Sequence, residues 1–256
     1  MDPPLITRRP AGRAHPTPLL FVHGAWHGGW CWDEHMLGFF ADAGYVAHAF
    51  DLRGHGDDPR PLRRRTSIGD YVEDLGAAVE SLDSPPVLIG HSMGGLIVQR
   101  HLEGRRLPGA VLLASVPVRG VWGTSLRVAR RHPVALLQAN LTLRLRPLVS
   151  GERLTRSLFF GDDMAAEDVA RHAARLGDEA YCAYLGMFRP ARPARVLTPI
   201  LVVAAERDGV FTLDEQRDTA RAYGGEPVVV AGAAHDLMLD RRWEAAAGAI
   251  LEWLSR

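Results

Sequence analysis

The sequence contains no lysine, and all 30 basic residues are arginine. Chemistry that depends on a lysine amine is therefore excluded. Cysteine is also scarce: Cys31 and Cys182 are the only two in 256 residues, and they match no metal-binding or redox spacing. We expect two reduced, mostly buried thiols in preference to a disulfide.

An excess of charge and long apolar runs are missing as well. Arginine balances the 30 acidic residues, so the net charge predicts no attraction to nucleic acid or to an anionic membrane surface. No apolar run approaches the ~20 residues of a membrane span, and residues 1–16 lack the apolar core of a signal peptide. We expect a cytoplasmic protein of bacterial-type composition, with no nucleic-acid partner and no stable membrane insertion. A homodimer remains open.

The chain does contain short apolar runs that alternate with helical patterns, which is typical of a parallel α/β sheet. Strands are predicted at 19–22, 46–50, 86–90, 110–114, 199–205 and 227–232, with an edge strand in PLITRR near the start. Helices are predicted after Ser67, after Thr212 and over the C-terminal tail.

The alternation stops between residues 116 and 198. This stretch is far longer than an ordinary connection between strands, and it reads as several helices rich in Leu, Phe and Tyr. We expect a core domain formed by 1–115 and 199–256, with a helical cap at 116–198 over the carboxyl ends of the strands.

A single serine follows the strand-like run at 86–90. Ser92 lies in Gly90-His91-Ser92-Met93-Gly94, the pattern Gly-x-Ser-x-Gly, with a helical stretch after it. This context predicts a nucleophile elbow, in which the serine adopts a strained backbone conformation and small neighbours permit the sharp turn. We predict Ser92 as a catalytic nucleophile rather than part of an ordinary glycine-rich turn.

A serine hydroxyl needs a base and a group that orients that base. Asp208 and His235 each follow a predicted strand, in the order serine, acid, histidine, and we predict them as acid and base. Glu206 is the reserve acid. Asp236 is disfavoured because it adjoins the proposed base. The sequence predicts no catalytic role for other histidines. His91 packs in the elbow; His48, His101, His132 and His172 are surface or filler residues; and His15 and His35 belong to no motif.

Two backbone N–H groups are expected to stabilise the oxyanion that develops during acyl transfer. Met93 follows the nucleophile, and Ala25 follows a His-Gly turn directly after the strand 19–22. We predict these two amides as the oxyanion hole. His23 then shapes the loop, and no carboxylate accompanies His23 and His27 at a metal-binding spacing, so no metal site is predicted.

With these motifs in place, the chain resembles the α/β-hydrolase superfamily over nearly its whole length. The marks are HGAWHGGW, DLRGHG, GHSMGG, ERDGV and AAHDLML, in the family order, and the first is most similar to small methylesterases and hydroxynitrile lyases. The resemblance implies an eight-stranded, mostly parallel sheet with one reversed strand and an inserted cap. It also implies that Ser92, His235 and Asp208 form a triad, with Ala25 and Met93 as oxyanion donors. Lyases of this subgroup employ a lysine, which this chain lacks.

The expected activity is hydrolysis of a carboxylic ester of a small to medium apolar acyl or aryl substrate, through an acyl-enzyme and without a cofactor. Trp26 and Met238 are the candidate walls of the substrate pocket. Three alternatives share the triad and stay open: a thioesterase or peptidase-like hydrolase, a non-hydrolytic enzyme such as a cofactor-free dioxygenase or lyase, and a small-molecule receptor.

Overall fold

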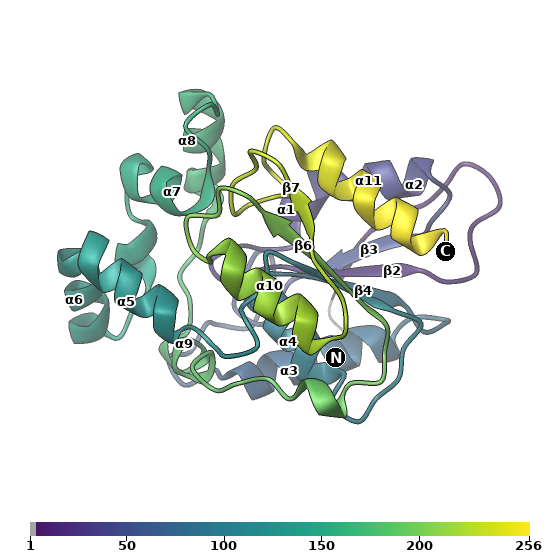
Figure 1. Ribbon diagram of the computed structural model, residues 1–256, viewed down its shortest axis with the longest axis horizontal. Coiled ribbons are helices and arrows are strands. Elements are labelled where there is room, and N and C mark those ends of the chain that lie inside the picture. Colours follow the sequence, from purple (N-terminus) through teal and green to yellow (C-terminus); the bar gives the residue numbers. More distant parts are fainter. Residues whose placement is uncertain (1–3) are drawn as a thin grey trace.

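The structure is a computed structural model, and it describes residues 4–256. Its centre is a seven-stranded sheet in the order β1-β3-β2-β4-β5-β6-β7, in which β1 runs antiparallel to β3 and all other pairs are parallel (Figure 1). The strands span β1 Leu5–Arg8, β2 Leu19–Val22, β3 Ala47–Phe50, β4 Val87–His91, β5 Ala110–Leu113, β6 Ile200–Ala205 and β7 Val228–Val230. All seven lie at the predicted positions. The resemblance implied one strand more than residues 4–256 contain.

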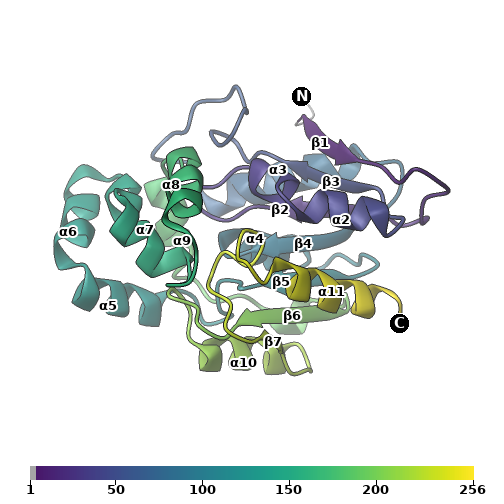
Figure 2. The same ribbon diagram turned by 90° about the horizontal axis from the view of Figure 1, so that it is seen from above.

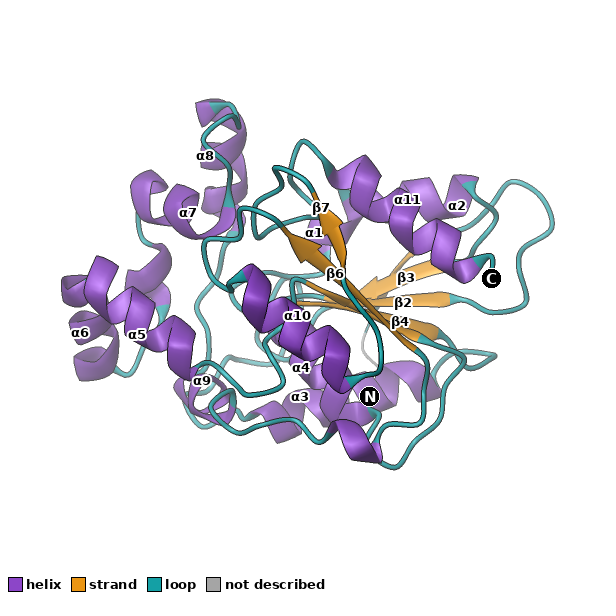
Figure 3. Cartoon of the chain, in the orientation of Figure 1, coloured by secondary structure: helices purple, strands orange, loops and turns teal. Residues whose placement is uncertain are grey.

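Helices cover both faces of the sheet (Figure 3). The faces divide the strands residue by residue: in β2, Leu19 and Phe21 join one buried cluster, and Leu20 and Val22 join the other. Helices α1 (Trp30–Asp33), α2 (Met36–Asp42) and α11 (Trp243–Leu254) pack on the first face; α3 (Ile68–Glu80), α4 (Met93–His101) and α10 (Leu213–Ala222) pack on the second. Burial on both faces explains why these strands are continuously apolar.

Two of the predicted helix starts are fixed by side-chain caps. Ser67 and Thr212 each accept a hydrogen bond from the backbone N–H three residues later, and the side chains of Asp70 and Glu215 return the contact. This reciprocal capping box satisfies N–H groups that have no partner inside the helix. The local signal in the sequence therefore predicted both boundaries correctly.

The chain leaves the sheet after β5 and returns at β6. The intervening residues form α5 (Trp122–Arg131), α6 (Pro133–Thr142), α7 (Glu152–Phe159), α8 (Ala166–Arg175) and α9 (Tyr181–Gly186), with short 3-10 helices η1 (Arg146–Val149) and η2 (Pro193–Arg195). Helices α5–α9 lie together beyond one end of the sheet (Figure 2). We call residues 116–198 the cap.

Both cysteines lie in the described residues as free thiols: Cys31 is buried and Cys182 is partly buried. Burial raises the pKa of the Cys31 thiol well above its usual value. Within residues 4–256, none of the helices combines the length and the apolar character that crossing a membrane would require.

Candidate active site

Ser92 lies at the turn between β4 and α4 with a left-handed backbone, φ 51° and ψ −117°. A non-glycine residue rarely adopts a positive φ, and the surrounding structure must hold it there. Four hydrogen bonds do so: the Ser92 N–H donates to the Leu113 carbonyl, and the Ser92 carbonyl accepts from the N–H groups of Gly95, Leu96 and Val116. The serine is therefore displayed by a rigid, strained turn at the end of the central strand.

The glycines around Ser92 are required by close backbone approach. A Cβ on Gly90 would lie 2.6 Å from the Gly94 carbonyl oxygen, and one on Gly94 would lie 2.3 Å from the Val22 oxygen. Real Cβ atoms do not come so close to backbone, so a side chain at either position would push α4 away from the sheet. The pattern Gly-x-Ser-x-Gly thus has a steric cause.

His235 and Asp208 come together as the sequence predicts. The His235 Nδ1 lies 2.9 Å from both carboxylate oxygens of Asp208, and both side chains are buried. Asp208 Oδ1 also accepts from the N–H groups of Val210 and Phe211. These bonds leave the carboxylate little freedom, so it can hold the imidazole in one orientation.

The environment of His235 changes its acidity. Burial alone lowers the pKa of the imidazole, but the neighbouring Asp208 carboxylate, assisted by Asp236, outweighs burial and raises the pKa above its ordinary value of 6.5. A carboxylate beside the ring favours the protonated form. His235 is thus suited to accept a proton that is released during a reaction.

The two alternative acids have other partners. Glu206 is exposed and its carboxylate accepts from the Gly232 N–H at 2.7 Å. Asp236 is fully buried, and its Oδ2 lies 3.0 Å from His27 Nε2. Neither carboxylate makes a hydrogen bond to the His235 ring among residues 4–256, which leaves Asp208 as its partner.

The loop after β2 lies directly against the serine. A Cβ on Gly24 would lie 3.1 Å from the Ser92 Cβ, and Ala25 lines the same cavity as Ser92. Met93 is the first residue of α4, so its N–H belongs to the group at a helix start that has no partner inside the helix. Both predicted oxyanion donors are therefore placed next to Ser92.

Three buried histidines hold the backbone around this loop. His23 accepts from the Leu52 N–H through Nε2 and contacts the Gly24 oxygen through Nδ1, while His27 contacts the Ala25 oxygen through Nδ1. His91 Nε2 lies 3.1 Å from the His235 carbonyl oxygen, and the two rings are 4.8 Å apart. Burial lowers the pKa of His23 and takes the pKa of His91 to about 3, so both are neutral. Packing of His91 in the elbow was expected.

Sequence reasoning missed the pairing of His27 with Asp236. This buried pair connects the oxyanion loop to the residue after the proposed base, 209 positions apart in the sequence. Burial by itself raises the pKa of the Asp236 carboxyl. The partner His27 outweighs burial and holds that pKa below its ordinary value. The available signal was the placement of both residues inside the motifs HGAWHGGW and AAHDLML, each one step from a predicted functional group.

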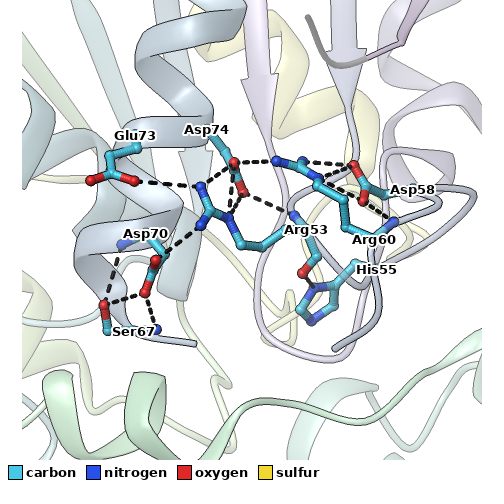
Figure 4. A network of polar contacts seen from close by, with 8 residues as sticks. All are labelled: Arg53, His55, Asp58, Arg60, Ser67, Asp70, Glu73 and Asp74. Carbon is cyan, nitrogen blue, oxygen red and sulfur yellow. Dashed lines mark hydrogen bonds and ion pairs between the residues drawn. The ribbon is translucent and has the colours of Figure 1, made fainter. Parts of the chain in front are cut away.

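The DLRGHG motif stabilises the loop that follows β2 through hydrogen bonds. Asp51 accepts from the N–H groups of Gly29 and Asp57, at 2.6 and 2.9 Å, and so joins two glycine turns. Figure 4 shows the next layer, where Arg53 and Arg60 both bond the buried Asp74 at 2.7 Å. Arg60, the first residue of the basic stretch 60–65, therefore belongs to this ion-pair network and is not merely solvated.

A cavity opens above Ser92, between the sheet and the cap. Its walls are mainly apolar, with Ser92, Thr124, Ser125 and Tyr184 as polar members; the others are Ala25, Trp26, Val116, Val121, Val128, Leu136, Leu148, Leu158, Phe159, Met187, Val210 and Phe211. Phe159 and Phe211 also pack on the His235 ring, with centroids 5.8 and 5.4 Å apart. The cavity therefore lies beside both the proposed nucleophile and the proposed base.

The two predicted pocket walls have different outcomes. Trp26 lines the cavity, and its indole Nε1 is buried without a hydrogen-bond partner in residues 4–256. Met238 is fully buried in the core cluster and is not among the lining residues, so that prediction is wrong.

The cap is joined to the core next to this cavity. The Gly177 N–H donates to the Trp26 carbonyl at 2.7 Å. The buried Glu179 accepts from Tyr71 and from the Ala180 N–H and lies 3.1 Å from His55 Nε2. Although burial opposes it, the Glu179 carboxylate raises the pKa of His55. The end of the cap is thus attached to the oxyanion loop and to the DLRGHG turn.

One group in the described chain has the spacing of a metal site. Ligand atoms of His91, His235 and Asp236 lie within 4.8 Å of one another. His235 Nδ1 is already bonded to Asp208, and Asp236 Oδ2 to His27. The group therefore reads as part of the polar packing around the proposed base, and we assign no metal to it.

The sequence is similar to known proteins that share this arrangement of strands and helices. The sequence matches the model of the Alpha/beta hydrolase family over residues 19–249. Similar curated proteins include Salicylic acid-binding protein 2 of Nicotiana tabacum, 30% identical over 152 residues that make up 58% of each chain. Methylesterase 18 of Arabidopsis thaliana is 41% identical over 30% of each chain. Monoacylglycerol lipase of Mycolicibacterium smegmatis is 26% identical over 86% of this chain and 82% of its own.

The matched part covers 58% of the tobacco protein and 30% of the Arabidopsis protein. Solved structures extend the likeness of fold to the whole chain. Monoacylglycerol lipase of Paleococcus ferrophilus has a TM-score of 0.74 at 21% identity, covering 99% of this chain and 98% of its own. Polyneuridine aldehyde esterase has a TM-score of 0.72 at 18% identity, covering 94% and 100%.

Proposed function

The chain belongs to the alpha/beta hydrolase family, and we propose that it is a serine esterase that cleaves carboxylic esters of small to medium apolar acyl or aryl groups. The observation that carries this proposal is the strained display of Ser92 beside Ala25, with the buried His235–Asp208 pair packed against the same cavity. Relatives named as methylesterases and a monoacylglycerol lipase support ester hydrolysis in general.

The proposed reaction begins with attack of the Ser92 hydroxyl on the ester carbonyl carbon. His235 accepts the hydroxyl proton, and the N–H groups of Ala25 and Met93 donate to the oxyanion of the tetrahedral intermediate. His235 then gives its proton to the departing alcohol, which leaves an acyl group on Ser92. Water attacks this acyl-enzyme with His235 again as the base, and the acid is released. These steps use groups of the chain and water.

Asp208 supports the base in two ways. Its bond to Nδ1 keeps the opposite ring nitrogen free to accept the serine proton, and its charge stabilises the imidazolium that forms. The raised pKa of His235 is the equilibrium sign of this stabilisation. Because His235 and Asp208 are both buried, water screens their interaction little.

The cavity suggests what the acyl side of the substrate resembles. Its apolar walls suit an alkyl chain or an aromatic ring, and its few polar groups can orient the molecule. Ser125 and Tyr184 share a hydrogen bond at 3.0 Å, and the Trp26 Nε1–H is an unused donor. An acyl group that carries one oxygen acceptor would satisfy that donor, whose desolvation otherwise costs about 1–3 kcal/mol.

The test is a panel of p-nitrophenyl esters of increasing acyl length, assayed with the wild type and with Ser92→Ala. We expect turnover by the wild type and a loss of about 10⁴-fold or more in kcat for the variant. Near-normal hydrolysis by Ser92→Ala would show that the nucleophile is misassigned. Absence of turnover with every ester, combined with a ligand that raises the Tm, would favour a receptor and overturn the esterase proposal.

A further inference from the structure

The outer side of the cap exposes large apolar side chains. Trp122 and Leu126 in α5, Val134, Leu137 and Leu141 in α6, and Leu143 just after it are between 41% and 76% exposed. Trp122 and Leu126 are four residues apart, and Val134, Leu137 and Leu141 follow at spacings of three and four. Residues at these spacings lie on one face of a helix, so each helix carries a continuous apolar stripe.

These stripes face away from the cavity. The opposite sides of the same helices supply Ser125, Val128 and Leu136 to the cavity wall, and Ala139 is fully buried. The two helices are therefore apolar on both sides. On the outer side, Trp122 also packs edge-on against Phe188, with ring centroids 4.7 Å apart, but it stays 67% exposed. In Figures 1 and 2, α5 and α6 lie at the end of the molecule farthest from the C-terminus.

The same part of the chain is strongly basic, although the whole protein has no net charge. Residues 119–160 hold eight arginines and a single acidic residue, Glu152. Four of the arginines are exposed and their side chains form neither an ion pair nor a hydrogen bond with any residue of 4–256: Arg130, Arg131, Arg144 and Arg153. We call these four arginines and the six exposed apolar residues the outer cap face.

A surface groove brings part of this charge together. Arg131 and Arg153 both line it, together with Val134 and Gln138 of α6. Burial, together with the positive charges of the two arginines, lowers the pKa of the neighbouring His132. A phosphate oxygen is the group that arginine pairs with best in such a setting.

We propose that the outer cap face docks the protein on an anionic lipid bilayer. A basic helical surface with exposed Leu, Val and Trp side chains is what such a surface binds: apolar groups enter the headgroup region and arginines pair with lipid phosphates. Docking needs no membrane-spanning helix. It would place the cap, and the cavity behind it, next to apolar molecules dissolved in the membrane, whatever reaction the cavity performs.

The combination of positive charge and apolar side chains favours an anionic bilayer over a second copy of the chain and over nucleic acid. A second copy of the chain docked through the same face would bring two arginine-rich surfaces together, which like-charge repulsion opposes. Nucleic acid would pair with the arginines but would leave the exposed leucines without an apolar partner. An anionic bilayer satisfies both kinds of side chain.

The test is sedimentation of the full-length protein with vesicles, which reads binding without reference to catalysis. We expect binding to phosphatidylglycerol vesicles that weakens as salt rises, and much weaker binding to phosphatidylcholine vesicles. L137Q/L141Q should lower the partition coefficient at least about tenfold, from lost apolar burial. R130Q/R131Q should lower it about fivefold for each arginine removed.

Leu197→Gln is the matched control. Leu197 is 72% exposed and lies three residues before β6, at the amino edge of the sheet and outside the outer cap face. It should bind as the wild type does, and circular dichroism should show all variants folded. Equal binding to both vesicle types, no binding to either, or loss of binding in Leu197→Gln as large as in L137Q/L141Q would each overturn the proposal. So would a wild type that dimerises in light scattering and that L137Q/L141Q renders monomeric.

Discussion

The core side and the cap side of the cavity are built on different principles. On the core side, Ser92 and His91 are held by hydrogen bonds to backbone groups, and His235 is held by the Asp208 carboxylate. On the cap side, Val121, Val128, Leu136 and Leu148 offer only apolar contact. Side-chain hydrogen bonds within the wall join Ser125 to Tyr184 and Thr124 to the Val210 carbonyl.

This difference fits two separate tasks: the core side holds the groups that we propose to react, and the cap side forms the surface that we propose to select the ester. Groups that move protons must be held to within a fraction of an ångström, and buried hydrogen bonds achieve this better than apolar contacts do. Apolar walls can change in size without leaving polar groups unpaired. We therefore expect changes on the core side to abolish the reaction or unfold the protein, and changes on the cap side to alter which ester is preferred.

The largest effect should come from Asp208→Asn on the core side. The variant removes the charge that stabilises the imidazolium and favours the wrong tautomer of His235, so kcat should fall about 10³–10⁴-fold. Steady-state hydrolysis of the best p-nitrophenyl ester measures this. Glu206→Gln is the control, because Glu206 bonds Gly232 instead. If Glu206→Gln loses as much activity as Asp208→Asn, the acid is wrongly assigned.

Removing His27 should cost mainly stability. His27→Ala leaves the buried Asp236 carboxylate without its partner, and breaking such a pair costs about 3–5 kcal/mol of unfolding free energy. Urea denaturation followed by circular dichroism measures the loss. His48→Ala is a suitable comparison, because His48 is also buried but bonds only the Thr7 hydroxyl, 2.9 Å away. Equal losses of unfolding free energy in the two variants would show that the His27–Asp236 pair contributes no more than an ordinary buried hydrogen bond.

The pH profile should reveal the proposed base. His235 must be neutral to accept the serine proton, and its raised pKa keeps it protonated to a higher pH than an ordinary histidine. The acidic limb of kcat/KM should therefore have its midpoint above 6.5 and fall about tenfold per pH unit below it. Asp208→Asn should move this midpoint downward. A wild-type midpoint well below 6.5 would contradict the proposed environment of His235.

The smallest effect should come from Tyr184→Phe on the cap side. One lost hydroxyl interaction corresponds to about 0.5–1.5 kcal/mol, or about two- to tenfold in KM for acyl groups that carry an oxygen acceptor. Plain alkyl esters should be hydrolysed almost as before. Tyr181→Phe provides the control, since the Tyr181 hydroxyl bonds Asn140 outside the cavity. Equal KM changes for both acyl types would argue against polar recognition by the cap.

The sequence predicted the fold well because its signals are local. Short, mainly apolar runs predicted the positions of the strands, and the capping boxes at Ser67 and Thr212 predicted two helix starts. The residues that come after strands β4 and β6 were informative for the same reason: a parallel sheet collects its strand ends at one edge, so Ser92 and Asp208 had to lie near each other.

Pairings across the chain were harder to predict. The motif around position 27 marks a functional region, but it does not name Asp236, 209 residues later, as the partner of the imidazole. No local pattern indicates that Glu179 in the cap joins His55 and Tyr71 of the core. Met238 shows the same limit: a turn of a few residues decided whether it faced the cavity or the core. The basic outer cap face was hidden because acidic residues elsewhere cancel its charge in the total.

The hydrogen bond from Gly177 to the Trp26 carbonyl has a practical meaning for recombination with relatives. Trp26 has a positive φ of 65° and directly follows Ala25 in the oxyanion loop. The residue that supports this loop, Gly177, therefore belongs to the cap and not to the core. A chimaera that replaces the cap as one block would exchange this support together with the cavity walls. A crossover placed before Leu176 would replace the cavity walls that come from the earlier part of the cap. It would keep residues 176–180, and with them the native hydrogen bond to the oxyanion loop.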